Sequence, residues 1–310
     1  MSWDYKVSAI MPVYNGEEFV GDAIDSVLSQ TLDSVELVVV DDGSTDGSAE
    51  VIEQYLPDDR IQFFTQENQG VTETTNRGIR KARGELLTIH PQDDFSKPDR
   101  FEKQIAVLEE NPDVGLVYTP AMFIDFDGNE LGEWGSWREG ERIPSRELFY
   151  KLYVDGNFLA SPAVVFRRDH LDDDQRPWGD PDMDVASDWE HWLDAAQHYD
   201  AYELPDPLLK MQRDPDHDYL GGRRETVLEE EKVVLQRVRE RYADGPTPVT
   251  RRHYARAMSN HYLRELKFRL REEEDYRASA RLAMKIFALN PLNRGLYYEF
   301  VRFASSLSPR

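Results

Sequence analysis

Adjacent carboxylates follow two of the apolar runs in this chain. Asp41 and Asp42 end a run that begins near Val35, and Asp93 and Asp94 come soon after the run at 85–89. A run of β-branched residues without polar alternation is typical of a buried strand in a parallel sheet. Open α/β sheets bind ligands beyond the carboxyl ends of such strands, where carboxylates can accept hydrogen bonds. The alternative for both pairs is an ordinary polar turn.

Alternating apolar patterns predict the elements that position these carboxylates. Strands are predicted at 6–12, 35–41, 60–65, 85–89 and 114–119, and helices at 17–30, 47–55, 70–83 and 98–110. Gly84 is predicted as the C-cap of the third helix. Strands and helices that alternate with short connections predict a parallel, doubly wound sheet.

The pattern changes after Pro120. The sequence then predicts a hairpin at 123–134 that turns at 127–129, a helix at 146–153, a strand at 161–166, a helix at 189–198 and a strand at 201–204. From residue 222 the chain is predicted to be mostly helical. We therefore expect an α/β domain over 1–220, with an acceptor-side part at about 120–220, and a helical region over 221–310.

Composition narrows the classes of protein. The chain has 310 residues and no cysteine, which excludes disulfides and thiolate metal sites. We find no signal peptide and no run near the ~20 apolar residues of a membrane-spanning helix, so we expect a cytoplasmic protein. The net charge of −23, with 28 Arg and only 9 Lys, argues against nucleic acid as a partner and suggests a halophilic source. An ordinary acidic protein is the alternative.

The charge is unevenly distributed. Residues 251–310 carry 13 basic and 6 acidic side chains, a net of +7, whereas residues 1–250 carry 24 and 54, a net of −30. The basic segment also contains apolar positions such as Leu282, Ile286, Phe287 and Tyr297. Helices with arginine on one face and aromatics on another can lie in a membrane interface. The alternative is that this apolar stripe packs on the α/β domain and that the arginines pair with its acidic surface.

Several short segments match one family in order and spacing. They are Ile10–Asn15 (IMPVYN), Val40–Asp46 (VDDGSTD), Asn68–Gly70 (NQG), Asn76–Gly78 (NRG), Ala82–Glu85 (ARGE), and Asp93–Asp94 followed by Pro98. The chain resembles the family 2 nucleotide-sugar glycosyltransferases with the A-type glycosyltransferase fold, from about Val7 to His217. The resemblance implies a Rossmann-like, mostly parallel sheet and an enzyme that uses a nucleotide-diphosphate sugar.

The resemblance assigns the donor site to the edge described above. It implies that Asp42 reads the nucleobase, with Pro12 and Tyr14 lining the same slot, and that Asn76 also belongs to the donor site. Asp93 would support the ribose and a divalent cation, Mg²⁺ or Mn²⁺, and Asp94 would ligate that cation directly. The family frequently has an Asp two positions before Asp93, where this chain has Pro91.

The resemblance also assigns the chemistry of transfer. Asp188 matches an acidic residue at the start of a helix that deprotonates the acceptor hydroxyl, although Ser187 replaces the acid that often precedes it. The alternative is that Asp188 only N-caps this helix. Arg213 and His217 match basic residues that close over the donor diphosphate, and a solvated loop is the alternative for both.

These expectations lead to an inverting glycosyltransferase. The family commonly acts on lipid-linked saccharides, so such an acceptor and a peripheral contact of 251–310 with the cytoplasmic membrane face are expected. Two alternatives stay open: a degenerate protein that binds nucleotide sugars without transfer, and a nucleotidyltransferase. The second would want a basic, Gly-rich phosphate loop, whereas Glu17 and Glu18 make the first loop acidic.

Overall fold

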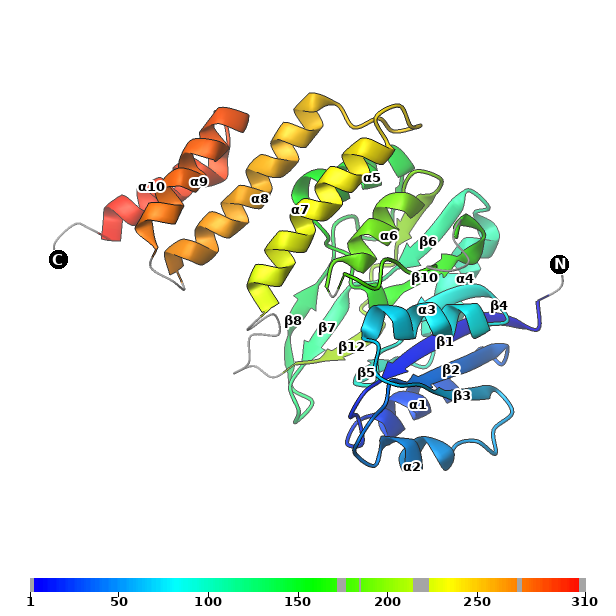
Figure 1. Ribbon diagram of the computed structural model, residues 1–310. Coiled ribbons are helices and arrows are strands. Elements are labelled where there is room, and N and C mark those ends of the chain that lie inside the picture. The colour runs from blue at the N-terminus through cyan, green and yellow to red at the C-terminus, as the bar shows by residue number, and fades with distance from the viewer. Residues whose placement is uncertain (1–2, 172–176, 184, 214–222, 272–274, 307–310) are drawn as a thin grey trace. The chain divides into compact units, whose positions relative to one another are not determined.

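Most of the predicted strands form one large sheet. The computed structural model describes residues 3–171, 177–183, 185–213, 223–271 and 275–306 (Figure 1). The sheet has the order β3-β2-β1-β4-β10-β6-β11-β9. Its strands are β1 (Tyr5–Val13), β2 (Val35–Asp41), β3 (Ile61–Thr65), β4 (Gly84–Ile89), β6 (Val114–Tyr118), β9 (Arg142–Ile143), β10 (Val164–Arg167) and β11 (Asp200–Glu203). The predicted fold class, a mostly parallel α/β sheet, is confirmed.

One antiparallel strand interrupts the parallel order. Strands β1 to β4 are parallel to one another, and β11 is parallel to β6, but β10 lies antiparallel between β4 and β6. The strand predicted at 161–166 is also shorter than expected. Ser161–Ala163 form a single 3₁₀ turn, η1, and the strand begins at Val164. Because β10 runs antiparallel, η1, which precedes it, lies at the carboxyl ends of the parallel strands.

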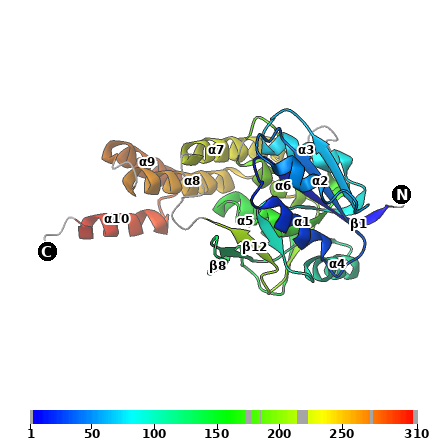
Figure 2. The same ribbon diagram turned by 90° about the horizontal axis from the view of Figure 1, so that it is seen from below.

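Helices cover both faces of this sheet. Figure 2 shows α3 and α4 on opposite sides of β1. The helices are α1 (Val20–Leu28), α2 (Ser48–Glu53), α3 (Val71–Lys81), α4 (Arg100–Glu110) and α6 (Ser187–Ala195). Helix α1 buries Val20, Ala23, Ile24 and Val27, the i, i+3, i+4, i+7 stripe of a helix that packs on a sheet. The core that results holds the sheet edge in place.

Gly84 does not end a helix, as the sequence predicted. Helix α3 ends at Lys81 with Ala82 in extended conformation as its C-cap, and Gly84 is the first residue of β4. A Cβ at Gly84 would lie 2.6 Å from the backbone nitrogen of Ser8 on β1. Glycine is therefore required here by the close approach of two strands, not by a helix end.

A second, smaller sheet carries one of the carboxylate pairs. It has the order β5-β12-β7-β8, made of β5 (Asp94–Ser96), β12 (Leu209–Gln212), β7 (Ala121–Ile124) and β8 (Glu130–Trp134). Strands β7 and β8 form the predicted hairpin, in which Asn129 donates its backbone N–H to Asp125 Oδ1 at 2.8 Å. Strand β12 pairs Met211 with Asp94. This pairing fixes the backbone of Asp94.

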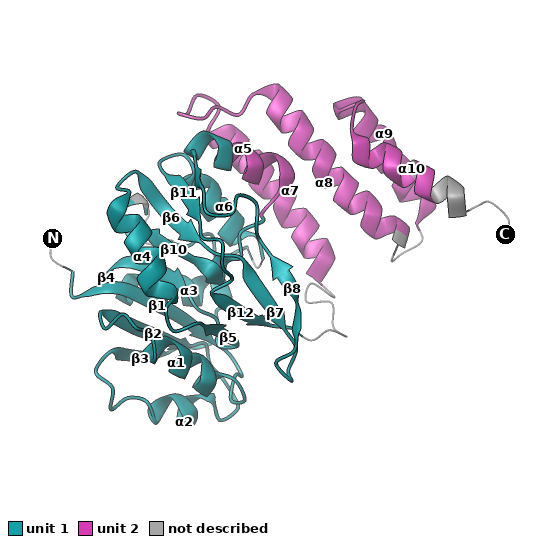
Figure 3. Ribbon diagram, turned by 180° about the vertical axis from the view of Figure 1, so that it is seen from behind, with its two compact units in different colours: residues 1–148, 158–221 teal, residues 149–157, 222–310 magenta. Residues whose placement is uncertain are grey.

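The chain divides into two compact units, coloured in Figure 3. The first comprises residues 1–148 and 158–221, and the second residues 149–157 and 222–310. The second unit therefore takes in most of helix α5 (Ser145–Asp155), which the sequence did not indicate. The remaining helices are η2 (Arg168–His170), α7 (Arg224–Arg241), α8 (Arg251–Arg271), α9 (Tyr276–Leu289) and α10 (Arg294–Ser306). None of the helices that the structure describes is long and apolar enough to cross a membrane.

Candidate active site

The carboxyl ends of three parallel strands bring the predicted donor residues to one edge. In the register of β1 and β2, Val13 lies beside Asp41, and in that of β1 and β4, Ile10 lies beside Ile89. The segments that follow these strands contain Tyr14, Asp42 and the residues from His90 onward. The sheet therefore gathers at one edge three segments that are separated by about 30 to 50 residues in the sequence.

Asp42 is buried and anchored by the start of α3. Gln66 donates its side-chain amide to Asp42 Oδ1 at 2.7 Å, and the backbone N–H groups of Gln69 and Gly70 donate to the carboxylate at 2.9 Å each. Gly70 has a φ of +84°, a conformation that favours glycine. A carboxylate offers about four lone-pair sites, so the three bonds leave capacity for one further donor such as a base imide N–H.

The loop after β1 is braced so that Tyr14 projects outward. Gln92 accepts a hydrogen bond from the Tyr14 backbone N–H at 2.8 Å and returns one to the Tyr14 carbonyl at 3.1 Å. Asn15, at a φ of +49°, accepts from the Thr45 N–H at 2.8 Å. Tyr14 is 49% exposed, and Pro12 is half-buried. Both lie at the edge where stacking on a base was predicted.

Asp94 is buried, and its neighbour Asp93 is half-buried. Burial raises the pKa of Asp94 well above its ordinary value, Asp93 raises it further, and Arg213 and Arg100 oppose the shift. Burial also raises the pKa of Asp93, again opposed by Arg213. Asp94 Oδ2 is buried without a hydrogen-bond partner. A buried carboxylate oxygen with nothing to bind is the kind of atom that a cation satisfies.

Asp93 and Asp94 fit a divalent cation that takes most of its ligands from substrate phosphates and water. Among the described residues, no group of three or more His, Cys, Asp or Glu side chains is arranged to hold a metal. Mg²⁺ is usually bound by one or two carboxylates together with substrate phosphates and water, and a pair is sufficient for that mode. At the position where the family frequently has a further Asp, Pro91 accepts the Asp94 backbone N–H at 3.4 Å.

Arg100 lies buried behind the acid pair and ties four segments together. Its guanidinium donates to Gln104 Oε1 at 3.0 Å, Ser96 Oγ at 2.9 Å, Thr88 Oγ1 at 3.0 Å and the Pro162 carbonyl oxygen at 2.5 Å. Burial lowers the pKa of Arg100 to about 9, with Asp94 opposing the shift, so the side chain stays charged at neutral pH. It supplies a fixed positive charge to the pair and also holds η1.

Of the two basic residues predicted to cover the diphosphate, Arg213 is described. It follows β12 directly, donates its backbone N–H to Ile124 O at 2.7 Å, and places its guanidinium carbon 5.1 Å from the Phe123 ring centroid. Because it lowers the pKa of both Asp93 and Asp94, its charge lies close to the acid pair. His217 lies outside the described residues.

Asp188 is oriented by a serine from η1. Ser161 donates its hydroxyl to Asp188 Oδ2 at 2.7 Å and accepts a hydrogen bond from Trp192 Nε1 at 3.0 Å. Asp188 is not the N-cap of its helix, since α6 begins at Ser187 and its N-cap is Ala186 without a side-chain bond. The capping alternative is therefore wrong. Trp192 fixes the Ser161 hydroxyl, and that hydroxyl fixes the Asp188 carboxylate. A carboxylate oriented in this way is suited to act as a general base.

Asn76 and Ser187 make hydrogen bonds to other residues of the protein. Asn76 is fully buried, accepts from the backbone N–H of Trp178 at 2.7 Å, and donates to the carbonyl of Gly179 at 3.0 Å. These contacts favour a role in positioning that segment, and direct binding of the donor by Asn76 stays a prediction. Ser187 is buried, with its Oγ 3.2 Å from Thr72 Oγ1.

Comparisons with known proteins identify the family of this chain. The family model described as "Glycosyl transferase family 2" matches residues 8–174, more than half of the chain. The chain belongs to glycosyl transferase family 2. It is 39% identical over 167 residues to an uncharacterized glycosyltransferase of Haemophilus influenzae, covering 53% of this chain and 63% of that protein. It is 31% identical over 153 residues to chondroitin synthase of Escherichia coli, covering 49% and 22%.

Solved structures with low sequence identity to this chain show a similar fold. TarS of S. aureus, residues 1–349, has a TM-score of 0.67 at 17% identity, over 92% of this chain and 81% of that one. TarS has also been solved with UDP-GlcNAc. The mannosyltransferase PcManGT of Pyrobaculum calidifontis, solved with GDP-Man and Mn2+, has a TM-score of 0.51 at 18% identity, over 100% and 80%. The chain spans 63% of the length of its Haemophilus influenzae relative and 63% of that of an uncharacterized glycosyltransferase of Rickettsia typhi, so it matches less than two thirds of either protein.

Sequence reasoning missed Ser161 and Arg100. A signal for Arg100 exists: Arg100 and Gln104 lie on the same helical stripe as the apolar residues Phe101, Ile105 and Leu108. Polar residues on a predicted core face, four apart, indicate a buried polar network. No comparable local signal marks Ser161, because its partners are 27 and 31 residues away.

Proposed function

We propose that this family 2 protein is an inverting glycosyltransferase that moves a sugar from a nucleotide-diphosphate sugar to an acceptor hydroxyl. The observation that carries the proposal is the pair of acidic centres linked through η1. Arg100, which lies behind the acid pair, donates a hydrogen bond to the Pro162 carbonyl of η1, and Ser161 of the same turn orients Asp188. The proposed donor site and the proposed base are thus connected through two adjacent residues of one turn.

The chain's own residues perform the proposed reaction as follows. Asp42 and Tyr14 bind the base, and Arg213 lies over the diphosphate. Asp188 takes the proton of the acceptor hydroxyl while the acceptor oxygen attacks the anomeric carbon on the face opposite the diphosphate. The glycosidic bond to the donor breaks as the new one forms, the nucleoside diphosphate leaves with the electron pair, and the configuration at carbon inverts. No covalent sugar–enzyme intermediate is needed.

A divalent cation is proposed at Asp93 and Asp94. When bound, it would offset the charge that develops on the departing diphosphate. Because metal binding needs ionised carboxylates and the pKa of both acids is raised, protons compete with the cation as the pH falls. We therefore expect the affinity for Mn²⁺ to rise with pH across the acidic range, which calorimetric titration of the metal into the protein at several pH values measures. An affinity that does not change with pH would contradict this assignment.

The proposal is tested by incubating the protein with a panel of UDP- and GDP-sugars in Mg²⁺ or Mn²⁺. We expect release of the nucleoside diphosphate from at least one donor, which a coupled assay measures. Binding without any release would favour the degenerate binding protein. Formation of pyrophosphate from a nucleoside triphosphate and a sugar phosphate would favour the nucleotidyltransferase.

Ser161 offers a test of how the base is held. Loss of a hydrogen bond to a charged group costs about 1.5–3 kcal/mol, and about 1.4 kcal/mol corresponds to one pH unit. Ser161→Ala is therefore expected to lower kcat about tenfold to a hundredfold and to move the acidic limb of the pH–rate profile up by about one to two units, because the ionised form of Asp188 loses a donor. Ser161→Thr, which keeps the hydroxyl, should restore both. A lower kcat with an unmoved acidic limb in Ser161→Ala would assign Ser161 a packing role only.

We further propose that the acceptor is a lipid-linked saccharide and that the C-terminal helices touch the cytoplasmic face of a membrane. In the structure, some apolar residues of this predicted stripe are buried and others are exposed. Leu266, Leu282, Ile286 and Leu296 pack together as the core of α8, α9 and α10. Other large apolar side chains of these helices, and of the turn between α9 and α10, are exposed: Tyr276, Met284, Phe287, Leu292, Tyr297, Tyr298 and Val301. Exposed aromatics beside arginines support an interfacial contact.

We propose that this protein comes from a halophilic source, because it has a large excess of acidic side chains. Dense carboxylates repel one another at low ionic strength, and salt screens that repulsion. We therefore expect the melting temperature to rise as KCl is increased from 0.1 M toward molar concentrations. A melting temperature that does not depend on KCl would contradict a halophilic source.

A further inference from the structure

A basic cavity lies within the helical unit, between α8 and the turn that joins α9 to α10. Its volume is about 710 Å³, within the range of small-ligand sites. Arg252, Arg256 and Asn260 line it from α8, and Asn293 and Arg294 line it from the turn. The first three are spaced by four residues, so they lie on one face of α8. No carboxylate of the described chain lines this cavity.

Among the described residues, the three arginines that line the cavity have no acidic partner, whereas other arginines of this unit do. Arg264 pairs with Glu231 at 3.0 Å and Arg269 with Glu225 at 2.9 Å. Within the described residues, no ion pair involves Arg252, Arg256 or Arg294. In a chain with a net charge of −23, three cations that share one cavity and no acid are a site at which an anion is stabilised.

The turn is held in place before any ligand binds. Asn293 is only 5% exposed, and its side-chain amide donates to Ser259 Oγ at 2.8 Å and to Asn260 Oδ1 at 3.2 Å. Its Oδ1 accepts the backbone N–H of Leu296 at 3.2 Å, in the first turn of α10. These bonds fix the N-terminus of α10 at the cavity, where the helix dipole adds to the attraction for an anion.

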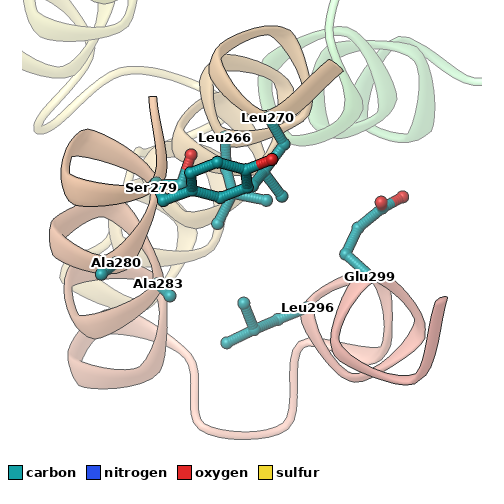
Figure 4. A pocket seen from close by; sticks show the side chains of 8 residues that line it. Leu266, Leu270, Ser279, Ala280, Ala283, Leu296 and Glu299 are labelled. Atoms are coloured by element: carbon teal, nitrogen blue, oxygen red, sulfur yellow. The ribbon is translucent and has the colours of Figure 1, made fainter. Parts of the chain in front are cut away.

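The apolar cavity of the same unit does not offer this chemistry. It has a volume of about 150 Å³ and lies among α8, α9 and α10, where Leu266, Leu270, Ala283 and Leu296 line it (Figure 4). Glu299 is its only charged lining residue within the described chain. A carboxylate there would repel an anion, so the anion site is the basic cavity.

We propose that the basic cavity binds the phosphate of an anionic phospholipid headgroup. The choice of a lipid over a free phosphate rests on Leu292, which lines the cavity and is 83% exposed, and on Tyr297 and Tyr298, which are 52% and 66% exposed in the first turn of α10. An exposed leucine in the lining of a basic cavity, with two exposed tyrosines shortly after Arg294 in the sequence, matches the boundary between headgroups and acyl chains. This inference rests on the proposed membrane contact and is independent of the transfer reaction.

The test compares two triple variants of the full chain that remove the same charge. One changes the cavity residues Arg252, Arg256 and Arg294 to Gln, and the other changes Arg277, Arg281 and Arg302, which are exposed on α9 and α10 outside the cavity. Binding is measured by flotation and titration with vesicles of phosphatidylglycerol in phosphatidylcholine. Each basic residue at an anionic bilayer contributes about fivefold in affinity, so the cavity variant should bind about a hundredfold more weakly and the control less than about fivefold. Equal losses in both variants would overturn the proposal, because they would show attraction by net charge alone.

Leu292→Asn separates the lipid from a soluble anion. This variant should bind the same vesicles more weakly, while its binding of inorganic pyrophosphate, followed by ³¹P NMR, stays unchanged. Binding of pyrophosphate by the wild type without binding of vesicles would overturn the lipid assignment, and so would a failure to bind either. Nucleoside diphosphate release is measured on every variant. A protein that binds vesicles through the cavity but releases no nucleoside diphosphate would contradict the proposed function and leave this site standing.

Discussion

Replacing Asp188 by asparagine is expected to lower kcat by about two orders of magnitude or more, the usual size of a general-base effect. Asparagine keeps the shape of the side chain and can still accept the Ser161 hydrogen bond, but it cannot take a proton from the acceptor. Donor affinity should therefore stay close to that of the wild type. Turnover and donor binding are measured separately, by nucleoside diphosphate release and by calorimetry.

Asp182→Asn is the matched control for this change. Asp182 is an exposed aspartate six residues before Asp188, and the same net charge is lost. It should retain activity within about twofold, as surface substitutions away from special features usually have small effects. An Asp188→Asn protein that loses donor affinity as strongly as turnover would contradict the assignment of Asp188 as the base.

Replacing Asp94 by alanine is expected to abolish turnover that depends on a divalent cation and to leave the fold intact. Loss of one preorganised electrostatic group at a developing charge typically costs about a hundredfold or more. The far-UV circular dichroism spectrum should not change. Asp206→Ala, at an exposed position beside the smaller sheet's strand β12, should keep both activity and its dependence on Mn²⁺. Unchanged activity and metal dependence in Asp94→Ala would refute the assignment.

A substitution at Asp94 that abolishes turnover is also expected to raise the stability of the metal-free protein. A carboxyl whose pKa is raised in the folded state binds more protons folded than unfolded, so the free energy of unfolding falls as the pH rises from the unfolded pKa to the folded pKa. Above that window the cost of the buried charge is fully present. Asp94→Asn removes it, so the metal-free variant should melt higher than the wild type at neutral pH. A gain of about 1 kcal/mol corresponds to about 2–4 °C. Melting curves in EDTA measure this, and a lower melting temperature would contradict it.

The parallel half of the fold was predictable because its signals are local. The run at Val35–Asp41 is fully buried, and the turn residues that follow it stand where the strand ends. The position of β10 was not predictable, because a four-residue strand between β4 and β6 is chosen by packing against partners more than 45 residues away. Gly84 was misassigned for the same reason, since the reason for glycine there is Ser8 on a neighbouring strand.

The candidate site divides in the same way. Asp42, Asp93 and Asp94 could be predicted because short motifs carry them to one sheet edge. The hydroxyl of Ser161 and the guanidinium of Arg100 could not, because their roles come from contacts across the fold. The three-residue strand β5 is also too short to predict from its own sequence, and its pairing with β12 brings Arg213 toward the acid pair.

The stereochemistry of donor turnover tests the central claim most directly. With an α-linked UDP- or GDP-sugar that the panel identifies as a donor, ¹H NMR of the anomeric proton follows the first sugar product formed, whether water or a supplied hydroxyl is the acceptor. Single displacement with Asp188 as the base predicts the β-anomer as the initial product, which forms in the presence of Mg²⁺ or Mn²⁺ and is lost in Asp188→Asn. An α-anomer as the first product would contradict single displacement with Asp188 as the base.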